Sequence, residues 1–92
     1  MDMDGFEWDP AKAAANLAKH HVDFADAALS LEDPRARTVP DPDSTAEERF
    51  ITLAADPQGT VLVTVYAYVA ENRRIISSRK ASPGERKRYE KP

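Results

Sequence analysis

Two stretches near the N-terminus carry apolar residues at helical spacing. Asp9 followed by Pro10 is typical of a helix start, because aspartate caps free backbone N–H groups and proline fits the first helical position. The alanine-rich run 11–21 predicts the first helix. Asp23 is a second capping residue, and apolar residues at every third or fourth position after it predict a second helix that ends at about Leu31.

The rest of the chain is rich in β-branched and aromatic residues, which favour strands. Their pattern predicts short strands at residues 6–8 and 37–39, and longer ones at residues 49–54, 60–68 and 74–78. The run 60–68 is almost continuously apolar, which is typical of a strand buried on both faces. We therefore expect this strand at the centre of a sheet.

The two faces of this central strand differ in character. One face is wholly apolar and consists of Val61, Val63, Val65 and Ala67. We expect that face to pack against the helices. Tyr66 and Tyr68 then point to the opposite, more open face, where tyrosine rings can stack on nucleic-acid bases. Half-buried sheet tyrosines are the simpler interpretation of the same pair.

Residues 82–85 read Ser-Pro-Gly-Glu, a capping-box pattern that predicts a short final helix. The order of elements indicates an α+β fold, in which two N-terminal helices pack on a small antiparallel sheet of three to four strands and a short helix closes the chain. A chain of 92 residues has room for one domain, so we expect residues 1–92 to form a single unit.

Charge is distributed unevenly along the chain. Residues 1–58 contain 5 Lys/Arg and 13 Asp/Glu, whereas residues 59–92 contain 8 Lys/Arg and 3 Asp/Glu, so parts of net charge −8 and +5 make up a chain of net charge −3. The basic block at residues 73–91 is a candidate anion-binding surface, although a solvated basic helix explains it as simply.

The chain has no cysteine, and residues 1–9 lack the apolar core of a signal peptide, so we expect a cytoplasmic protein without membrane contact.

Motifs for metals or cofactors are missing from the sequence. His20 and His21 are adjacent, which places them on different sides of a helix, and the 3 glycines form no phosphate-binding loop. We therefore expect no metal and no cofactor.

The remaining Arg, Lys, His and Glu residues suit metal-free cleavage of RNA. That reaction needs a base for the ribose 2′-hydroxyl, cations around the transition state and an acid for the leaving 5′-oxygen.

Three segments in sequence order resemble the BrnT family of toxins. The first contains Phe6-Glu7-Trp8-Asp9, Lys12, Asn16, Lys19-His20, Val22 and Phe24. The second is Glu47-Glu48-Arg49-Phe50, and the third contains Arg74-Ile75-Ile76-Ser77-Ser78-Arg79-Lys80-Ala81, Glu85-Arg86 and Tyr89. No segment is decisive alone, but their joint order and spacing make the resemblance specific over residues 6–89.

The resemblance implies a RelE-like α+β fold and a metal-independent endoribonuclease that arrests growth by cutting RNA. It also implies an antitoxin of the BrnA type with a ribbon-helix-helix DNA-binding domain. Two toxins and two antitoxins are expected per complex, as a 2:2 heterotetramer, and operator DNA is bound only through the antitoxin.

The same resemblance implies a set of site residues. The expected catalytic residues are His20, Glu48, Arg79 and Lys80, and the expected RNA-binding residues are Lys19, Arg49, Tyr66, Arg74 and Ser78. We expect Arg79 to stabilise the charge of the transition state, and Glu48 or His20 to act as base or acid. We expect Arg49 and Lys80 to hold flanking phosphates, and Tyr66 to contact a base.

The sequence departs from the family pattern at one point. Family members often carry an arginine shortly after the long strand, in a segment like YTxRG, where this chain has Ala67 for the threonine and Val69 for the arginine. If that arginine takes part in catalysis, this protein lacks one phosphate cation, and Arg73 is the candidate substitute. The alternative function is then a weak or inactive toxin homologue that acts as a corepressor with its antitoxin.

Two further hypotheses concern the basic end of the chain. A stand-alone nucleic-acid binder is disfavoured, because the acidic residues 1–58 repel a long polyanion. The second hypothesis is that an acidic antitoxin segment covers residues 74–91 and blocks the entry of RNA.

Overall fold

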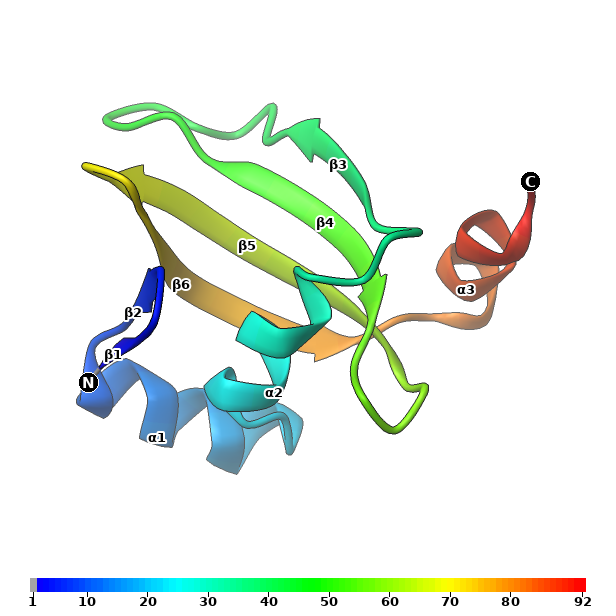
Figure 1. The fold of residues 1–92 in the computed structure, drawn as a ribbon, viewed down its shortest axis with the longest axis horizontal. Coiled ribbons are helices and arrows are strands. Elements are labelled where there is room, and N and C mark those ends of the chain that lie inside the picture. Colours follow the sequence, from blue (N-terminus) through cyan, green and yellow to red (C-terminus); the bar gives the residue numbers. More distant parts are fainter. Residues whose placement is uncertain (1) are drawn as a thin grey trace.

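A six-stranded mixed sheet and three helices make up residues 2–92, the part of the chain that the computed structural model describes (Figure 1). The elements follow in the order β1 (Asp2–Met3), β2 (Phe6–Glu7), α1 (Pro10–His20), α2 (Phe24–Ser30), β3 (Arg37–Pro40), β4 (Phe50–Ala55), β5 (Val61–Val69), β6 (Asn72–Lys80) and α3 (Pro83–Glu90). The expected α+β class and every expected element are confirmed.

The sheet is larger than the sequence predicted, and it is not purely antiparallel. Its strand order is β1-β2-β6-β5-β4-β3, which places β5 in the interior as expected. β2 pairs in parallel with β6, so that Phe6 lies opposite Arg73. The prediction of a wholly antiparallel sheet with three to four strands is wrong, because the N-terminal strands β1 and β2 extend the sheet beyond β6 and β2 runs parallel to β6. Local patterns predict such short strands but do not show which strand they join.

The helix boundaries follow from local capping. Asp9 Oδ1 accepts a hydrogen bond from the Ala11 N–H at 2.8 Å, and Asp23 Oδ1 accepts one from the Ala25 N–H at 2.9 Å. α1 stops at His21, whose φ of 59° lies in the left-handed region. At α3 the capping box is complete, since Ser82 and Glu85 each accept the other's backbone N–H. All three predicted helix starts are confirmed.

The face of β5 that packs on the helices is the reverse of the one expected. Leu62 and Tyr66 belong to the apolar core, together with Phe24 of α2 and Trp8, whereas Val63 faces the other side. Thr64 also lies on the helix side, where its Oγ1 is 2.9 Å from Ser78 Oγ, so its polar group is buried at little cost. The larger side chains Leu62 and Tyr66 therefore contribute to the core beneath the helices, and the valine face turns away from them.

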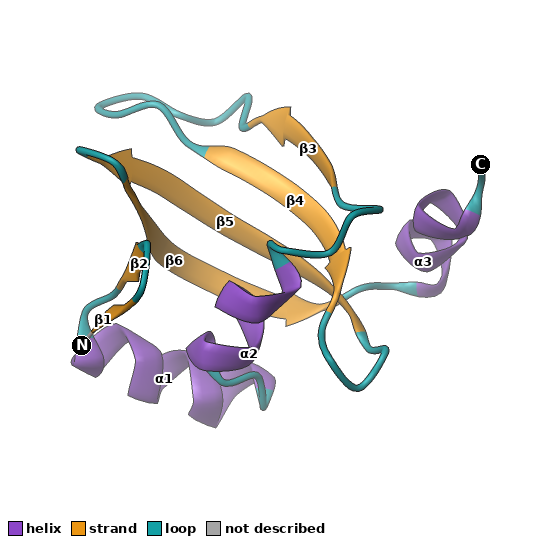
Figure 2. Cartoon of the chain, viewed as in Figure 1, coloured by secondary structure: helices purple, strands orange, loops and turns teal. Residues whose placement is uncertain are grey.

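The side of the sheet opposite α1 and α2, here called the open face, is only partly covered. Figure 2 shows α1 and α2 together on one side of the sheet and α3 apart from them, near the end of β4. Within residues 2–92, none of the helices has the length and apolar character that a membrane crossing requires.

Candidate active site

A pocket of about 520 Å³ opens on the open face, and its lining comes from the end of α1, from β4, β5 and β6, and from α3. Its lining side chains are His20, Ile51, Val63, Val65, Ser77, Ser78, Arg79, Glu85 and Arg88. The structure therefore brings His20 and Arg79 together, although they are far apart in the sequence. It adds Glu85 and Arg88, which were not predicted as site residues. Among residues 2–92, no group of three or more His, Cys, Asp or Glu could hold a metal ion.

The position of Arg79 is set by its register in the sheet and by Glu85. Arg79 lies opposite Val63 on the open face. Its Nη1 and Nη2 donate to Glu85 Oε1 and Oε2 at 2.8 and 2.9 Å. This two-pronged bond raises the pKa of the Arg79 guanidinium. The guanidinium therefore stays charged, with its two N–H groups arranged to bind an anion that offers two oxygens.

Glu85 occupies the place that such an anion would take. The bond from Arg79, with a smaller contribution from the backbone N–H of Ser82, lowers the pKa of the Glu85 carboxyl to about 2. The carboxylate is thus ionised at neutral pH and competes with any phosphate for Arg79. Sequence reasoning treated Glu85 only as a cap of the final helix and as part of a family segment.

Asn16 fixes the last turn of α1 against β6. Its side chain donates to Ser78 O at 2.8 Å and to Val22 O at 3.2 Å, and it accepts from the Ser78 N–H at 3.1 Å. Asn16 thus pairs with β6 as one residue of a neighbouring strand would. His20 lies one helical turn after Asn16 and shares its side of the helix. This amide therefore places the imidazole beside the strand that carries Arg79.

Contacts at both ends hold α3 in place. At its start, Glu85 binds Arg79, and near its end the Tyr89 hydroxyl donates to Asp33 Oδ2. Burial favours the neutral form of Asp33, but hydrogen bonds from Tyr89 and from the Ala55 N–H more than offset this and lower the pKa of its carboxyl. The Arg35 guanidinium lies 5.0 Å from the centre of the Tyr89 ring. The helix thereby presents Arg88 to the pocket.

A second group of expected site residues lies towards the β5–β6 hairpin. Arg74 Nη2 is 2.5 Å from Glu47 Oε1, and Arg49 Nε is 3.5 Å from the same oxygen. Arg74 pairs with Ala67 and Arg79 with Val63, so the two arginines share the open face but stand about 13 Å apart along the strands. Glu48 is exposed in the adjoining loop and does not line the pocket.

The remaining expected residues lie outside the pocket or are buried. Lys19 and Lys80 are exposed and do not line it, and Lys80 faces the helix side because it pairs with Leu62. Ser78 borders the pocket, but it is 1% exposed and its hydroxyl bonds to Thr64.

The expectation that Tyr66 faces the open side is wrong, because Tyr66 is 5% exposed and stacks on Phe50 with ring centres 5.5 Å apart. Its neighbour Tyr68 is 56% exposed.

Val69, which replaces the family arginine, lies far from this pocket. It ends β5 opposite Asn72, about 20 Å along the strand from Val63. Arg73 does not substitute for the missing cation on the open face. Its guanidinium lies 4.7 Å from the centre of the Phe6 ring and 3.4 Å from Glu32 Oε1, on the helix side of the sheet. The departure therefore affects the hairpin end and leaves the pocket intact.

Comparison with known proteins gives matches to a family model and to solved structures. A family model described as the ribonuclease toxin BrnT of type II toxin–antitoxin systems matches residues 8–85. A crystal structure of the Brucella abortus ribonuclease toxin BrnT is similar in fold, with a TM-score of 0.66 and 28% sequence identity over 84% of this chain and 95% of that chain. Among curated proteins, none matches this chain significantly.

Proposed function

Because the chain belongs to the BrnT family of ribonuclease toxins of type II toxin–antitoxin systems, we propose that it is a metal-independent endoribonuclease that arrests bacterial growth. It acts in the cytoplasm and is neutralised by a BrnA-type antitoxin, in a complex of two copies of each protein. Operator DNA is bound through the antitoxin. The observation that carries the proposal is the pocket in which His20, Arg79 and Arg88 meet on the open face.

The pocket supplies the groups that cleavage without a metal requires. In this reaction the 2′-hydroxyl gives its proton to His20 as its oxygen attacks phosphorus, the bond to the 5′-oxygen breaks, and His20 returns the proton to that oxygen, so that a cyclic phosphate and a free 5′-hydroxyl result. An imidazole ring has nitrogens that can accept and donate a proton, and His20 supplies that ring to the pocket, so it is the proposed acid–base group. Arg79 and Arg88 stabilise the negative charge that builds up on the phosphoryl oxygens.

RNA binding requires an exchange of partners at Arg79. The scissile phosphate displaces the Glu85 carboxylate from the guanidinium, since both anions offer two oxygens to the same N–H groups. Arg74, farther along the same face, then holds a flanking phosphate after release from Glu47. This division assigns the chemistry to one end of β5 and β6 and the binding of flanking RNA to the other.

The test is cleavage of a mixed RNA by the purified, antitoxin-free protein in EDTA, beside Arg79→Ala. Arg86→Ala is the matched control, because Arg86 is an exposed arginine of α3 that does not line the pocket. We expect the wild type and R86A to cleave, and R79A to lose about 10²–10³-fold in kcat. Equal cleavage by R79A and wild type would place the chemistry elsewhere.

Val69 supports a second candidate function, that of a corepressor without ribonuclease activity. The predicted signature is a folded wild-type protein that binds its antitoxin but cuts no RNA. The distance of Val69 from the pocket favours the enzyme over this alternative, since Val69 is not among the residues that line the pocket with His20 and Arg79.

A further inference from the structure

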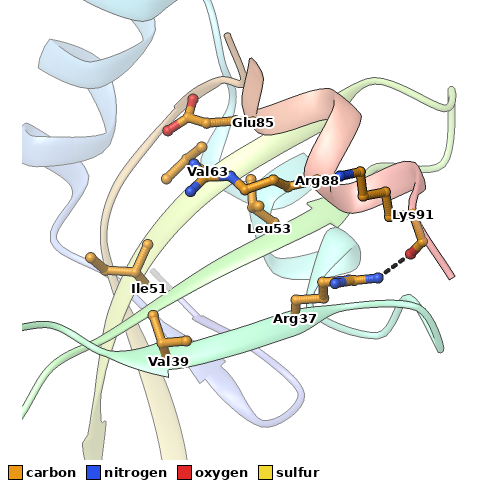
Figure 3. Close-up of a pocket in the computed structure, with 8 residues that line it drawn as sticks. All are labelled: Arg37, Val39, Ile51, Leu53, Val63, Glu85, Arg88 and Lys91. Atoms are coloured by element: carbon orange, nitrogen blue, oxygen red, sulfur yellow. Dashed lines mark hydrogen bonds between the residues drawn. The ribbon is translucent and has the colours of Figure 1, made fainter. Parts of the chain in front are cut away.

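A second hollow of about 310 Å³ adjoins the pocket on the open face (Figure 3). Its lining side chains are Arg37, Val39, Ile51, Leu53, Val63, Glu85, Arg88 and Lys91, and we call it the apolar groove. The floor consists of four aliphatic side chains from three adjacent strands. Val39 remains 55% exposed there, although it is a branched aliphatic residue. An apolar floor open to water is typical of a surface that a partner covers.

Basic side chains border this floor. Arg37 stands on β3, and Arg88 and Lys91 stand on α3 and just after it, on the opposite side of the groove (Figure 3). Arg37 donates to the backbone oxygen of Lys91, which links the two borders. The carboxylate in the lining, Glu85, is already bound to Arg79. The groove is therefore cationic on a protein whose net charge is −3.

The groove and the candidate active site share part of their lining. Ile51, Val63, Glu85 and Arg88 line both hollows. A chain seated in the groove would thus stand at the border of the pocket and contact Arg88 directly. β3 is the last strand of the sheet, so the groove is accessible from that edge.

We propose that the apolar groove is the docking site of the antitoxin, and that the docked segment closes the adjoining RNA-cleavage pocket. The segment carries apolar side chains that enter the groove between β3 and α3, and acidic side chains that meet Arg37, Arg88 and Lys91. The inference rests on the proposed function, in which an antitoxin neutralises this toxin. It differs from the expected cover over residues 74–91, because the groove combines Glu85, Arg88 and Lys91 of that segment with side chains of β3, β4 and β5.

The chemistry of the floor favours a protein segment over RNA. The lining holds aliphatic side chains and no aromatic ring on which a base could stack, whereas recognition of single-stranded RNA relies on such stacking. Burial of aliphatic side chains against one another is the main source of affinity between proteins, and the cationic border selects an acidic partner.

The test measures the affinity of the purified antitoxin encoded with this toxin for the full-length toxin and its variants. Val39→Asp places a carboxylate on the groove floor, and Leu29→Asp is the matched control, since Leu29 is an aliphatic residue of α2 that is 43% exposed outside the groove. We expect at least a 10-fold increase in Kd for V39D and no change for L29D. Circular dichroism serves as the control that both variants are folded.

A second variant tests the charge of the border independently of the floor. Arg37→Glu should weaken antitoxin binding at least 5-fold and flatten its dependence on salt, because one cation is lost and an anion replaces it. Wild-type affinity in both V39D and R37E would overturn the proposal. Weaker RNA cleavage by V39D with unchanged antitoxin affinity would assign the groove to RNA and overturn it too. Affinity is measured without RNA, so a failure of the ribonuclease proposal shows separately, as a wild type that binds the antitoxin but does not cleave.

Discussion

The two ends of the β5–β6 pair carry similar charges but are built differently. At the pocket end, buried hydrogen bonds tie α1 to β6, with Asn16 7% exposed and Ser78 1% exposed. At the hairpin end, Arg74 and Arg49 meet Glu47 in partly exposed ion pairs, and Tyr68 stands largely in water. Surface ion pairs contribute little to stability and exchange partners easily, whereas buried networks hold their geometry.

This difference shows which end is suited to chemistry. Catalysis needs groups that are held in position before the substrate arrives, and binding of a flexible strand tolerates groups that move. The buried Asn16–Ser78 network holds α1 and β6 in place, so the pocket end meets the first requirement in its backbone, although the Arg79–Glu85 pair there is itself partly exposed. The hairpin end meets the second. Four predictions test this comparison, from the largest expected effect to the smallest.

His20→Gln should lower kcat for RNA cleavage about 10²–10⁴-fold, because glutamine cannot exchange a proton. Glu48→Gln is the matched change near the hairpin end and should alter kcat less than 3-fold, roughly the limit for a group that performs no proton transfer. Single-turnover cleavage assays check both. The reverse order of effects would move the acid–base group to the loop before β4.

Asn16→Ala should lower the free energy of unfolding by about 2–4 kcal/mol, since it leaves the buried N–H and C=O of Ser78 without partners. Asn72→Ala at the hairpin end removes one long bond, 3.3 Å from Glu7 Oε1, and should change stability by less than about 0.5 kcal/mol. Urea unfolding measures both. Similar losses in the two variants would refute the contrast in rigidity.

Val69→Arg restores the family arginine at the hairpin end, where the side chain is 37% exposed and the cost to folding is small. The added cation should lower the KM for RNA about 2–10-fold and steepen its salt dependence, with little change in kcat. Steady-state cleavage at two salt concentrations is the measurement. A rise in kcat of two orders of magnitude would mean that the chemistry needs this end.

The contact of Glu85 with Arg79 should make the smallest contribution, below about 1 kcal/mol, because water screens the pair. The pH dependence of this contribution follows from the pKa of Glu85, which is about 2 in the folded state and 4.5 ordinarily. Between pH 2 and pH 4.5 the unfolded chain therefore binds more protons than the folded chain. The stabilisation is complete above pH 4.5 and disappears as the pH falls to 2. Urea unfolding of wild type and Glu85→Gln should therefore differ at pH 7 and converge near pH 2. A constant difference would contradict this origin.

Local signals in the sequence predicted the elements well. Capping residues such as Asp9, Asp23 and Ser82 act on their own neighbours, so their effect is readable without the fold. The orientation of β5 was predicted wrongly, because side-chain size and the hydrogen bond between Thr64 and Ser78 outweighed the simple count of apolar residues. Strand pairing between β2 and β6 depends on distant segments and left no local trace.

The candidate site was predictable in part for the same reason. His20 and Arg79 were named from a resemblance, and the structure brings them into one pocket. Glu85 and Arg88 join them because α3 is held at both ends, by the bond of Glu85 to Arg79 and by that of Tyr89 to Asp33, a residue far away in the chain. Glu47 was passed over in favour of Glu48, since adjacent carboxylates cannot be distinguished until their directions are known.

The bond between Asn16 and Ser78 joins residues 62 positions apart. Contacts of such separation form late, because a long loop must close before they can stabilise anything. During translation, α1 leaves the ribosome well before β6, the strand that carries its partner Ser78. The growing chain therefore cannot form the proposed pocket of His20 and Arg79 until β6 has left the ribosome, which gives the cell an interval in which this protein exists without that pocket.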